Sequence, residues 1–173
     1  ILFVGSLDPR KQIDVLINAF SNIKDNLSNI NLVIVGKGKE EQNLKDLVKT
    51  LNIRNRVFFK GEINDPILML EFYKIAIVSV SFGQAGLSVL QSLGFGVPFI
   101  TKRNAISGGE ISNIIDNYNG FLCNDMKSLE SILFNLCKNK KYSRLIGKKA
   151  YDYYSDNCTL NNMVDGFKSA IEE

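Results

Sequence analysis

Residues 79–98, SVSFGQAGLSVLQSLGFGVP, pass from a strand-like run into a segment with helical spacing. The β-type residues break at residues 82–86, FGQAG, and the helical spacing then ends at Gly94, Gly96 and Pro98. Such a junction of small residues has two interpretations: an ordinary turn between a strand and a helix, or a cradle for a negatively charged ligand. The remainder of the chain decides between them.

Short apolar runs alternate with longer amphipathic stretches along the whole chain. The runs are almost continuously hydrophobic, as in strands that helices cover on both faces. We therefore expect an α/β fold, a Rossmann-like parallel sheet of about six strands with helices on both faces, formed by one domain over residues 1–173. The expected strands are residues 1–4, 31–35, 56–59, 75–80, 98–101 and 120–123, and the last expected helices are 128–138, 140–154 and 160–171.

The composition excludes several function classes. Among 173 residues there is no histidine, which rules out a catalytic histidine, a Ser-His-Asp triad and a histidine-ligated metal in this chain. The three cysteines form no C-x2-C pair, so they indicate neither a zinc site nor a disulfide framework, and reduced thiols of a cytoplasmic protein are expected. A net charge of +3 is too small to indicate a nucleic-acid partner.

Two further features bear on location and completeness. No apolar run approaches the roughly 20 residues that span a bilayer, and no leader peptide opens the chain. The chain begins on an expected strand without Met, so we expect a piece of a longer protein.

A dense basic stretch fits either a solvated helix face or contact with a membrane surface or polyanion. It comprises Lys138, Lys140, Lys141, Arg144, Lys148 and Lys149.

In a parallel α/β sheet, ligands bind where turns follow the carboxyl ends of the strands. Here these turns are residues 5–11, 36–39, 61–64 and 82–86. The first turn does not carry G-x-G-x-x-G, and G-x-x-x-x-G-K-S/T occurs nowhere in the chain. The sequence therefore argues against a dinucleotide fingerprint and against a P-loop NTPase.

Positively charged residues and glycines in these turns suggest an anion-binding crevice. Arg10 and Lys11 stand near the start of a helix, against its dipole, so they either answer to an anion or are solvated surface cations. Gly36 beside Lys37 allows a nucleobase or ribose to approach the backbone, although a plain turn has the same composition. Secondary candidates near other strand ends are Asn64, Lys102 and Glu110.

The opening stretch holds the strongest candidate. A helix that starts near Gly86 or Leu87 points free backbone N–H groups at the crevice that holds Lys11. Gly83 and Gly86 remove side chains that would block a diphosphate. Gln91 lies one turn into this helix and is placed to reach the same ligand.

The order of these motifs resembles the carboxyl-terminal, donor-binding half of GT-B glycosyltransferases of the large retaining family 4, also called group 1. ILFVGSLDPRKQIDVLINAF looks like the family's hVGRLxxxKGxDxLIxAF, LVIVGKGKEEQNLKDL like LxIVGxGPxxxxL, and RVFFKGEI like xVxFxGxV. GLSVLQSLGFGVPFIT is similar to GLxxLEAMAxGxPVIxT, and NGFLC to NGFLx. These motifs follow the family's order over nearly all of the chain, which makes them specific together.

Two departures from the family pattern concern charged residues. The family's Glu-x7-Glu pair falls on Gly83 and Gln91, so the acid beside the donor sugar is lost and the ribose contact becomes a neutral amide. The family's Arg and Lys at the donor diphosphate fall on Ser6 and Lys11, with Arg10 placed to compensate for the missing arginine.

The resemblance implies a donor site that uses no cofactor and no metal, and it places no catalytic residue in this chain. The lost sugar contact would then come from Gln84 or from backbone amides. The donor-binding residues implied are Gly5, Ser6, Arg10, Lys11, Gly36, Lys37, Gly61, Gly83, Gln84, Ala85, Gly86, Leu87 and Gln91.

The resemblance also implies a hexosyltransferase-type enzyme of bacterial surface polysaccharide synthesis. It would move a sugar, with retention, from a UDP-type or GDP-type nucleotide sugar to a glycan or lipid-linked acceptor. The acceptor domain is expected to precede this chain, so that the chain alone binds nucleotide weakly and transfers nothing. A cytoplasmic location is expected, with peripheral contact to the inner face of the cell membrane as an open option.

Two alternatives stay open. One is a sugar-nucleotide 2-epimerase of the same fold, against which stands the lack of the acids and histidines that such enzymes use. The other is a non-catalytic nucleotide-sugar binding module, which the missing glutamates favour.

Overall fold

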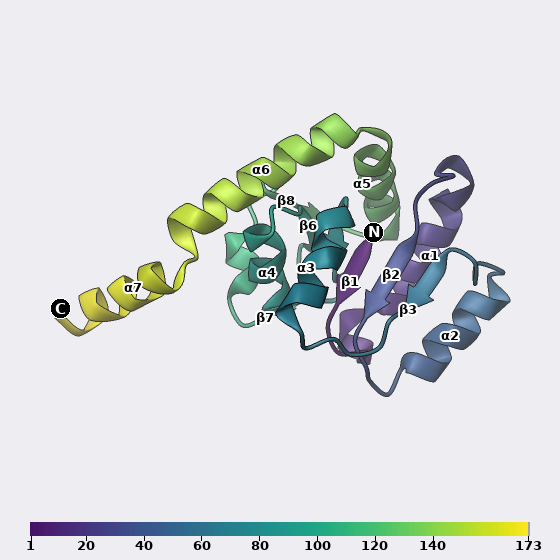
Figure 1. Cartoon of the computed structure of the whole chain (residues 1–173), viewed down its shortest axis with the longest axis horizontal. Helices are drawn as coiled ribbons and strands as arrows, with labels where there is room; N and C mark the ends of the chain where they lie inside the picture. The colour runs from purple at the N-terminus through teal and green to yellow at the C-terminus, as the bar shows by residue number, and fades with distance from the viewer. Residues whose placement is uncertain (173) are drawn as a thin grey trace.

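The computed structural model describes residues 1–172 and centres on one six-stranded parallel sheet (Figure 1). Its strand order is β3-β2-β1-β4-β6-β8, so the expected Rossmann-like parallel sheet is confirmed. The order reverses between β1 and β4, and the turns after these two strands therefore open beside each other. The strands are β1 (Leu2–Val4), β2 (Leu32–Val35), β3 (Val57–Phe59), β4 (Ser79–Val80), β6 (Phe99–Lys102) and β8 (Gly120–Cys123).

Helices cover both faces of this sheet. Successive residues of β1 point to opposite faces: Phe3 packs in a core with α1, α2 and α5, and Leu2 packs with α3. On the face of Leu2, α4 and α6 pack against Phe99 of β6. The helices are α1 (Ile13–Ile23), α2 (Glu41–Thr50), α3 (Pro66–Ile75), α4 (Ser88–Gly94), α5 (Met126–Lys138), α6 (Lys140–Asn157) and α7 (Leu160–Glu172), with 3-10 turns η1 (Pro9–Lys11), η2 (Lys24–Asn26) and η3 (Glu110–Asn113).

One expected strand is wrong over most of its length. The sequence predicts a strand over residues 75–80, but β4 is only Ser79–Val80, and Ile75 is the last residue of α3. Asp65 explains the difference, because its carboxylate accepts the N–H of Ile67 at 2.8 Å and caps a helix that Pro66 begins. Ile75 is 76% exposed, so this apolar residue ends a helix and does not fill the sheet.

A second, two-stranded sheet is a feature that the sequence did not predict. β5 (Gln84–Ala85) pairs in parallel with β7 (Ile106–Ser107). β5 follows β4 and β7 follows β6 after short turns, so this small sheet lies beyond the carboxyl ends of the main strands. It fixes the segment that leads into α4.

The carboxyl-terminal helices lie where they were expected. α5, α6 and α7 match the predicted helices 128–138, 140–154 and 160–171, and α7 extends away from the rest of the molecule (Figure 1). In the basic stretch, Lys148 pairs with Asp152 at 2.6 Å, and Lys149 lies over the ring of Tyr118, contacts typical of a solvated helix face. Within residues 1–172, no helix combines the length and apolar character needed to cross a membrane.

Candidate functional site

The turn after β1 holds two cations with different surroundings. The guanidinium of Arg10 pairs with Asp8 at 2.9 Å, and the backbone N–H of Arg10 donates to the same carboxylate at 3.1 Å. These two bonds lower the pKa of Asp8 below its usual value. Arg10 is thus engaged by its own turn, whereas Lys11 makes no ion pair within the described residues.

Lys11 bridges two parts of the crevice. Its aliphatic stem lies over Gly5, because a Cβ on Gly5 would be 3.8 Å from Lys11 Cε. Its ammonium group lies over the turn before α4, because a Cβ on Gly86 would be 3.6 Å from Lys11 Nζ. Desolvation and, second, the charge of Arg10 lower the pKa of Lys11. Lys11 is therefore a half-buried cation that faces the start of α4.

The turn before α4 presents backbone to this cation. α4 begins at Ser88 with Leu87 as N-cap, within two residues of the expected start. The N–H groups of Leu87 and Ser88 donate no backbone hydrogen bond in the described part of the chain. The side chain of Leu87 is 75% exposed, and Gln84 and Ala85 are held by β7. This turn is thus fixed by the fold, with its amide groups open.

Gly83 connects two other segments through its backbone and leaves no room for a side chain. Its N–H donates to Lys11 O at 3.1 Å, and its carbonyl accepts the N–H of Ile106 at 3.0 Å. A Cβ at this position would lie 2.3 Å from Arg10 O, which is closer than any real contact. The segments around Lys11 and Ile106 are therefore joined through residue 83, and the space that a glutamate would need is filled by backbone.

Gln91 lies on α4 and faces α3. The hydroxyl of Tyr73 donates to Gln91 Oε1 at 3.4 Å, and the Tyr73 ring stacks on Phe95 with centroids 4.6 Å apart. Burial raises the pKa of Tyr73 well above its usual value, so this hydroxyl stays a donor. The neutral amide is thus held by a neutral donor of α3, and Gln91 does not line the cavity at the carboxyl ends of β1, β2 and β3.

A cavity of about 270 Å³ lies at the carboxyl ends of β1, β2 and β3. Across it, Lys37 pairs with Glu62 at 3.6 Å, a residue of the predicted turn 61–64 that the sequence alone did not single out. The N–H of Gly36 donates to Gly61 O at 2.7 Å, which joins two of the turns. The lining residues are Val4, Gly5, Ser6, Val35, Gly36, Lys37, Glu62, Ile63, Asn64 and Met69.

Gly36 lies at a close contact between the turns that follow β1 and β2. It has φ +142°, and a Cβ there would lie 1.8 Å from Gly5 O. Gly38 repeats the pattern, since its Cβ would lie 2.3 Å from Leu7 O. The sequence left open whether these glycines admit a ligand or form a plain turn, and the structure shows the backbone of the β1 turn in the space above them.

The structure thus brings the predicted residues, except Gln91, which faces α3, into two adjoining groups that share Lys11 as their link. The first surrounds the start of α4 and the second lines the cavity, and their contact with a nucleotide remains a prediction. The first contains Arg10, Lys11, Gly83, Gln84, Ala85, Gly86 and Leu87; the second contains Gly5, Ser6, Gly36 and Lys37 with Gly61 beside them.

Other candidate regions are less suited to an anionic ligand. A larger cavity of about 410 Å³ lies at the amino-terminal edge of the sheet, lined mainly by apolar residues such as Phe58, Phe72 and Ile75. It holds none of the predicted site residues and lies away from the strand ends where α/β folds bind ligands. Among residues 1–172, no group of three or more His, Cys, Asp or Glu side chains gathers as a metal site.

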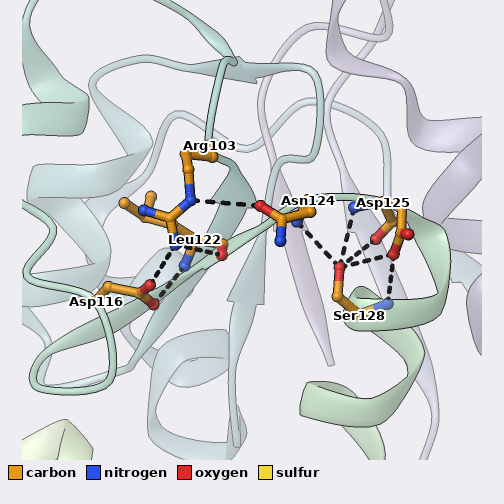
Figure 2. Close-up of polar contacts among 6 residues, drawn as sticks. All are labelled: Arg103, Asp116, Leu122, Asn124, Asp125 and Ser128. Atoms are coloured by element: carbon orange, nitrogen blue, oxygen red, sulfur yellow. Dashed lines mark hydrogen bonds and ion pairs between the residues drawn. The ribbon is translucent and has the colours of Figure 1, made fainter.

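A polar cluster beyond β6 and β8 is used by the fold itself (Figure 2). Arg103 donates to Asp116 at 2.6 Å and to Asn124 at 3.4 Å, which ties the end of β6 to the segments around β8. Next to it, Asp125 and Ser128 form a capping box that begins α5. These groups satisfy one another, so the cluster is structural.

The family model and the related sequences that match this chain all describe glycosyltransferases. The family model described as "Glycosyl transferases group 1" matches residues 1–153. An uncharacterized glycosyltransferase of Haemophilus influenzae is 30% identical, with 100% of this chain and 47% of the relative covered. The poly(ribitol-phosphate) alpha-N-acetylglucosaminyltransferase of Staphylococcus aureus is 23% identical over 96% of this chain and 34% of its own length. The chain thus spans between a third and a half of these relatives.

Comparison with solved structures shows the same fold. TarM of S. aureus, solved in complex with UDP and other ligands, superposes with a TM-score of 0.85 at 20% identity, covering 97% of this chain and 34% of TarM. HepE of Anabaena in complex with UDP gives a TM-score of 0.84 at 18% identity, covering 99% of this chain and 48% of HepE. The resemblance inferred from the motifs is confirmed at the level of family and fold.

Proposed function

Because the chain belongs to the glycosyl transferases group 1 family, we propose that it is the donor-binding half of a hexosyltransferase. In this proposal it binds a nucleotide-diphosphate sugar, of UDP or GDP type, at the carboxyl ends of its strands. The sugar passes with retention to a glycan or lipid-linked acceptor of surface polysaccharide synthesis. The acceptor is bound by a segment outside this chain, on the cytoplasmic side of the membrane, so that the chain alone binds nucleotide and transfers nothing.

The placement of Lys11 is the observation that carries this proposal. A half-buried ammonium group without an ion pair in the described residues loses hydration, and an anion restores the lost interaction. The group lies over Gly86, where no side chain obstructs a ligand. A diphosphate between Lys11 and the amides of Leu87 and Ser88 meets a cation and two open donors.

The cavity beside Lys11 supports the nucleoside end of this ligand. The aliphatic stem of Lys11 lies over Gly5, and Gly5 lines the cavity. A diphosphate bound to Lys11 can therefore be continuous with a nucleoside held between the β1, β2 and β3 turns. Ser6, Glu62 and Asn64 supply donors and acceptors there for a base and a ribose. The relatives TarM and HepE, solved with UDP, support a uracil nucleotide as the first ligand to test.

The reaction step that this half serves is departure of the nucleoside diphosphate. Negative charge grows on the diphosphate oxygen as the bond to the sugar breaks, and fixed donors stabilise that charge without rearrangement. Lys11 and the amides before α4 are such donors, and we propose that they act without a metal ion. Arg10 is held by Asp8 and contributes to the potential of the site.

Calorimetric titration of the chain with UDP and with GDP tests the proposal. We expect one of them to bind and Lys11→Met to weaken it by about tenfold or more, the value of one charge-assisted hydrogen bond. Lys127→Met, on the exposed first turn of α5, is the matched control and should bind like the unaltered chain. Absence of binding to both nucleotides, or an undiminished affinity in Lys11→Met, contradicts the proposal.

A non-catalytic nucleotide-sugar binding module is the second candidate. The closed space at Gly83 and the neutral Gln91 favour it, because neither acid of the family pair is available. Assay of the complete protein with donor and acceptor separates the two: transfer supports the enzyme, and tight donor binding without transfer or hydrolysis supports the module. Recovery of a 2-epimer from the same assay would instead identify an epimerase.

A further inference from the structure

The segment after β6 carries an acidic side chain to the edge of the proposed donor site. In the β5–β7 pair, Ser107 lies opposite Ala85, directly before Gly86. Glu110 then turns back in η3, and its Oε2 accepts the hydroxyl of Ser107 at 3.1 Å and the N–H of Gly108 at 2.9 Å. The carboxylate is therefore held at the end of β7, beside the turn over which Lys11 lies.

Glu110 and Lys11 share one electrostatic environment. Hydrogen bonds from its own backbone N–H, from Ser107 and from Gly108 lower the pKa of Glu110, and the charge of Lys11 lowers it further. The charge of Glu110 in turn partly opposes the lowering of the Lys11 pKa. The two groups do not form a contact ion pair in the described structure, so the ammonium group of Lys11 is not neutralised by Glu110.

The carboxylate also has free acceptor capacity. Its Oε2 accepts from Ser107 and Gly108, whereas Oε1 accepts no hydrogen bond from another residue within residues 1–172. An ionised carboxylate has several acceptor positions, and vicinal hydroxyl groups of a sugar are matching donors. Residue 83 cannot supply such an acid, because its Cβ position is closed by Arg10 O.

We propose that Glu110 binds hydroxyl groups of the hexose whose diphosphate lies on Lys11, and so selects the sugar. The inference rests on the proposed donor function. The Ile106 N–H bond to Gly83 O, at 3.0 Å, couples the segment that carries Glu110 to the turn before α4. The acid thus reaches the donor from the β6 side of the crevice, while position 83 contributes only backbone.

The test compares the binding of a nucleoside diphosphate with that of its sugar conjugate. Calorimetry measures UDP, UDP-glucose and UDP-N-acetylglucosamine, or the corresponding GDP and GDP-mannose pair if GDP binds. Glu110→Gln keeps an acceptor for Ser107 and Gly108 but removes the charge. We expect UDP affinity to stay equal or to rise, because a negative charge near the phosphates is lost, while the preferred UDP-sugar binds about tenfold more weakly.

Glu71→Gln is the matched control, since Glu71 is an exposed glutamate of α3 paired with Lys74 and lines none of the site. It should leave all affinities unchanged. Equal affinity of the unaltered chain for UDP and both UDP-sugars, or a Glu110→Gln variant that changes UDP and UDP-sugar by the same factor, overturns the role of Glu110. In those cases UDP still binds and the proposed function stands, whereas loss of all nucleotide binding removes both.

Discussion

Gly147 of α6 and Gly96, which follows α4, touch backbone to backbone: a Cβ on Gly147 would lie 2.2 Å from Gly96 O. This contact sets how closely α6 approaches the end of α4, the helix whose first turn faces Lys11. Gly96 itself has φ +67°, a conformation that favours glycine. The pair therefore links the carboxyl-terminal helix layer to the position of the proposed diphosphate site.

Gly147→Ala should destabilise the chain by about 1–3 kcal/mol, because the added methyl group forces α6 away from α4. Urea denaturation followed by circular dichroism measures the free energy of unfolding. Gly166→Ala is the matched control on α7, where a Cβ meets nothing within 4 Å and no loss is expected. Similar losses in both variants would show that the contact between residues 147 and 96 does not matter.

Gly83→Glu, which restores the acid of the family pattern, should fail to improve donor binding and should lower the melting temperature. The Cβ collides with Arg10 O, so the turn that positions Lys11 must move. Differential scanning fluorimetry with and without UDP reports both effects. Gly86→Ala is the comparison, since its Cβ would meet only Lys11 Nζ at 3.6 Å and the fold should tolerate it. A stable Gly83→Glu variant with higher UDP-sugar affinity would refute this account.

Glu110 should contribute stability that depends on pH in a defined direction. Its pKa in the folded chain is lowered by hydrogen bonds from its own N–H, Ser107 and Gly108, so the contribution is present above the unfolded value of about 4.3. It is lost as the pH falls through the folded pKa. We expect the stability difference between the unaltered chain and Glu110→Gln to be present at neutral pH and to shrink in acid. A difference that stays constant across a pH series of urea titrations would contradict this.

The buried thiols should resist alkylation until the chain unfolds. All three cysteines are free and buried, and burial raises the pKa of Cys123 to about 12. Iodoacetamide at neutral pH should leave Cys123 and Cys137 unmodified, as read by peptide mass spectrometry. The same reagent in urea should modify both, which serves as the control. Rapid modification of Cys123 in the folded chain would show that β8 is not packed as described.

The main sheet could be predicted because its signal is local. A buried parallel strand must be apolar along its length, and five of the six expected runs match strands closely. The strand expected over residues 75–80 was wrong because apolar residues also occur at the carboxyl end of α3, a helix that begins at Pro66 behind the N-cap Asp65. The β5–β7 pair had no periodic signal, since two-residue strands show none.

The turns that form the candidate site were predictable from the sequence, whereas the packing of these turns against each other was not. Glycines after strands mark the turns, but composition does not say what fills the space beside each glycine. Gly36 and Gly83 turned out to lie against neighbouring backbone, while Gly86 faces Lys11. The distinction depends on how separate turns pack against each other, which a single sequence does not encode locally. Glu110 was only a secondary candidate from the sequence. Its position depends on the β5–β7 pairing, which the sequence did not predict.

The closed space at Gly83 also has an evolutionary consequence. A single change from glycine to an acid at this position meets Arg10 O before it can contact any sugar. An acid at this position therefore requires a change in the turn around Lys11 as well, so the effect of a substitution in one segment depends on the other. Single substitutions that alter the choice of donor sugar are therefore expected at neighbouring positions and not at residue 83.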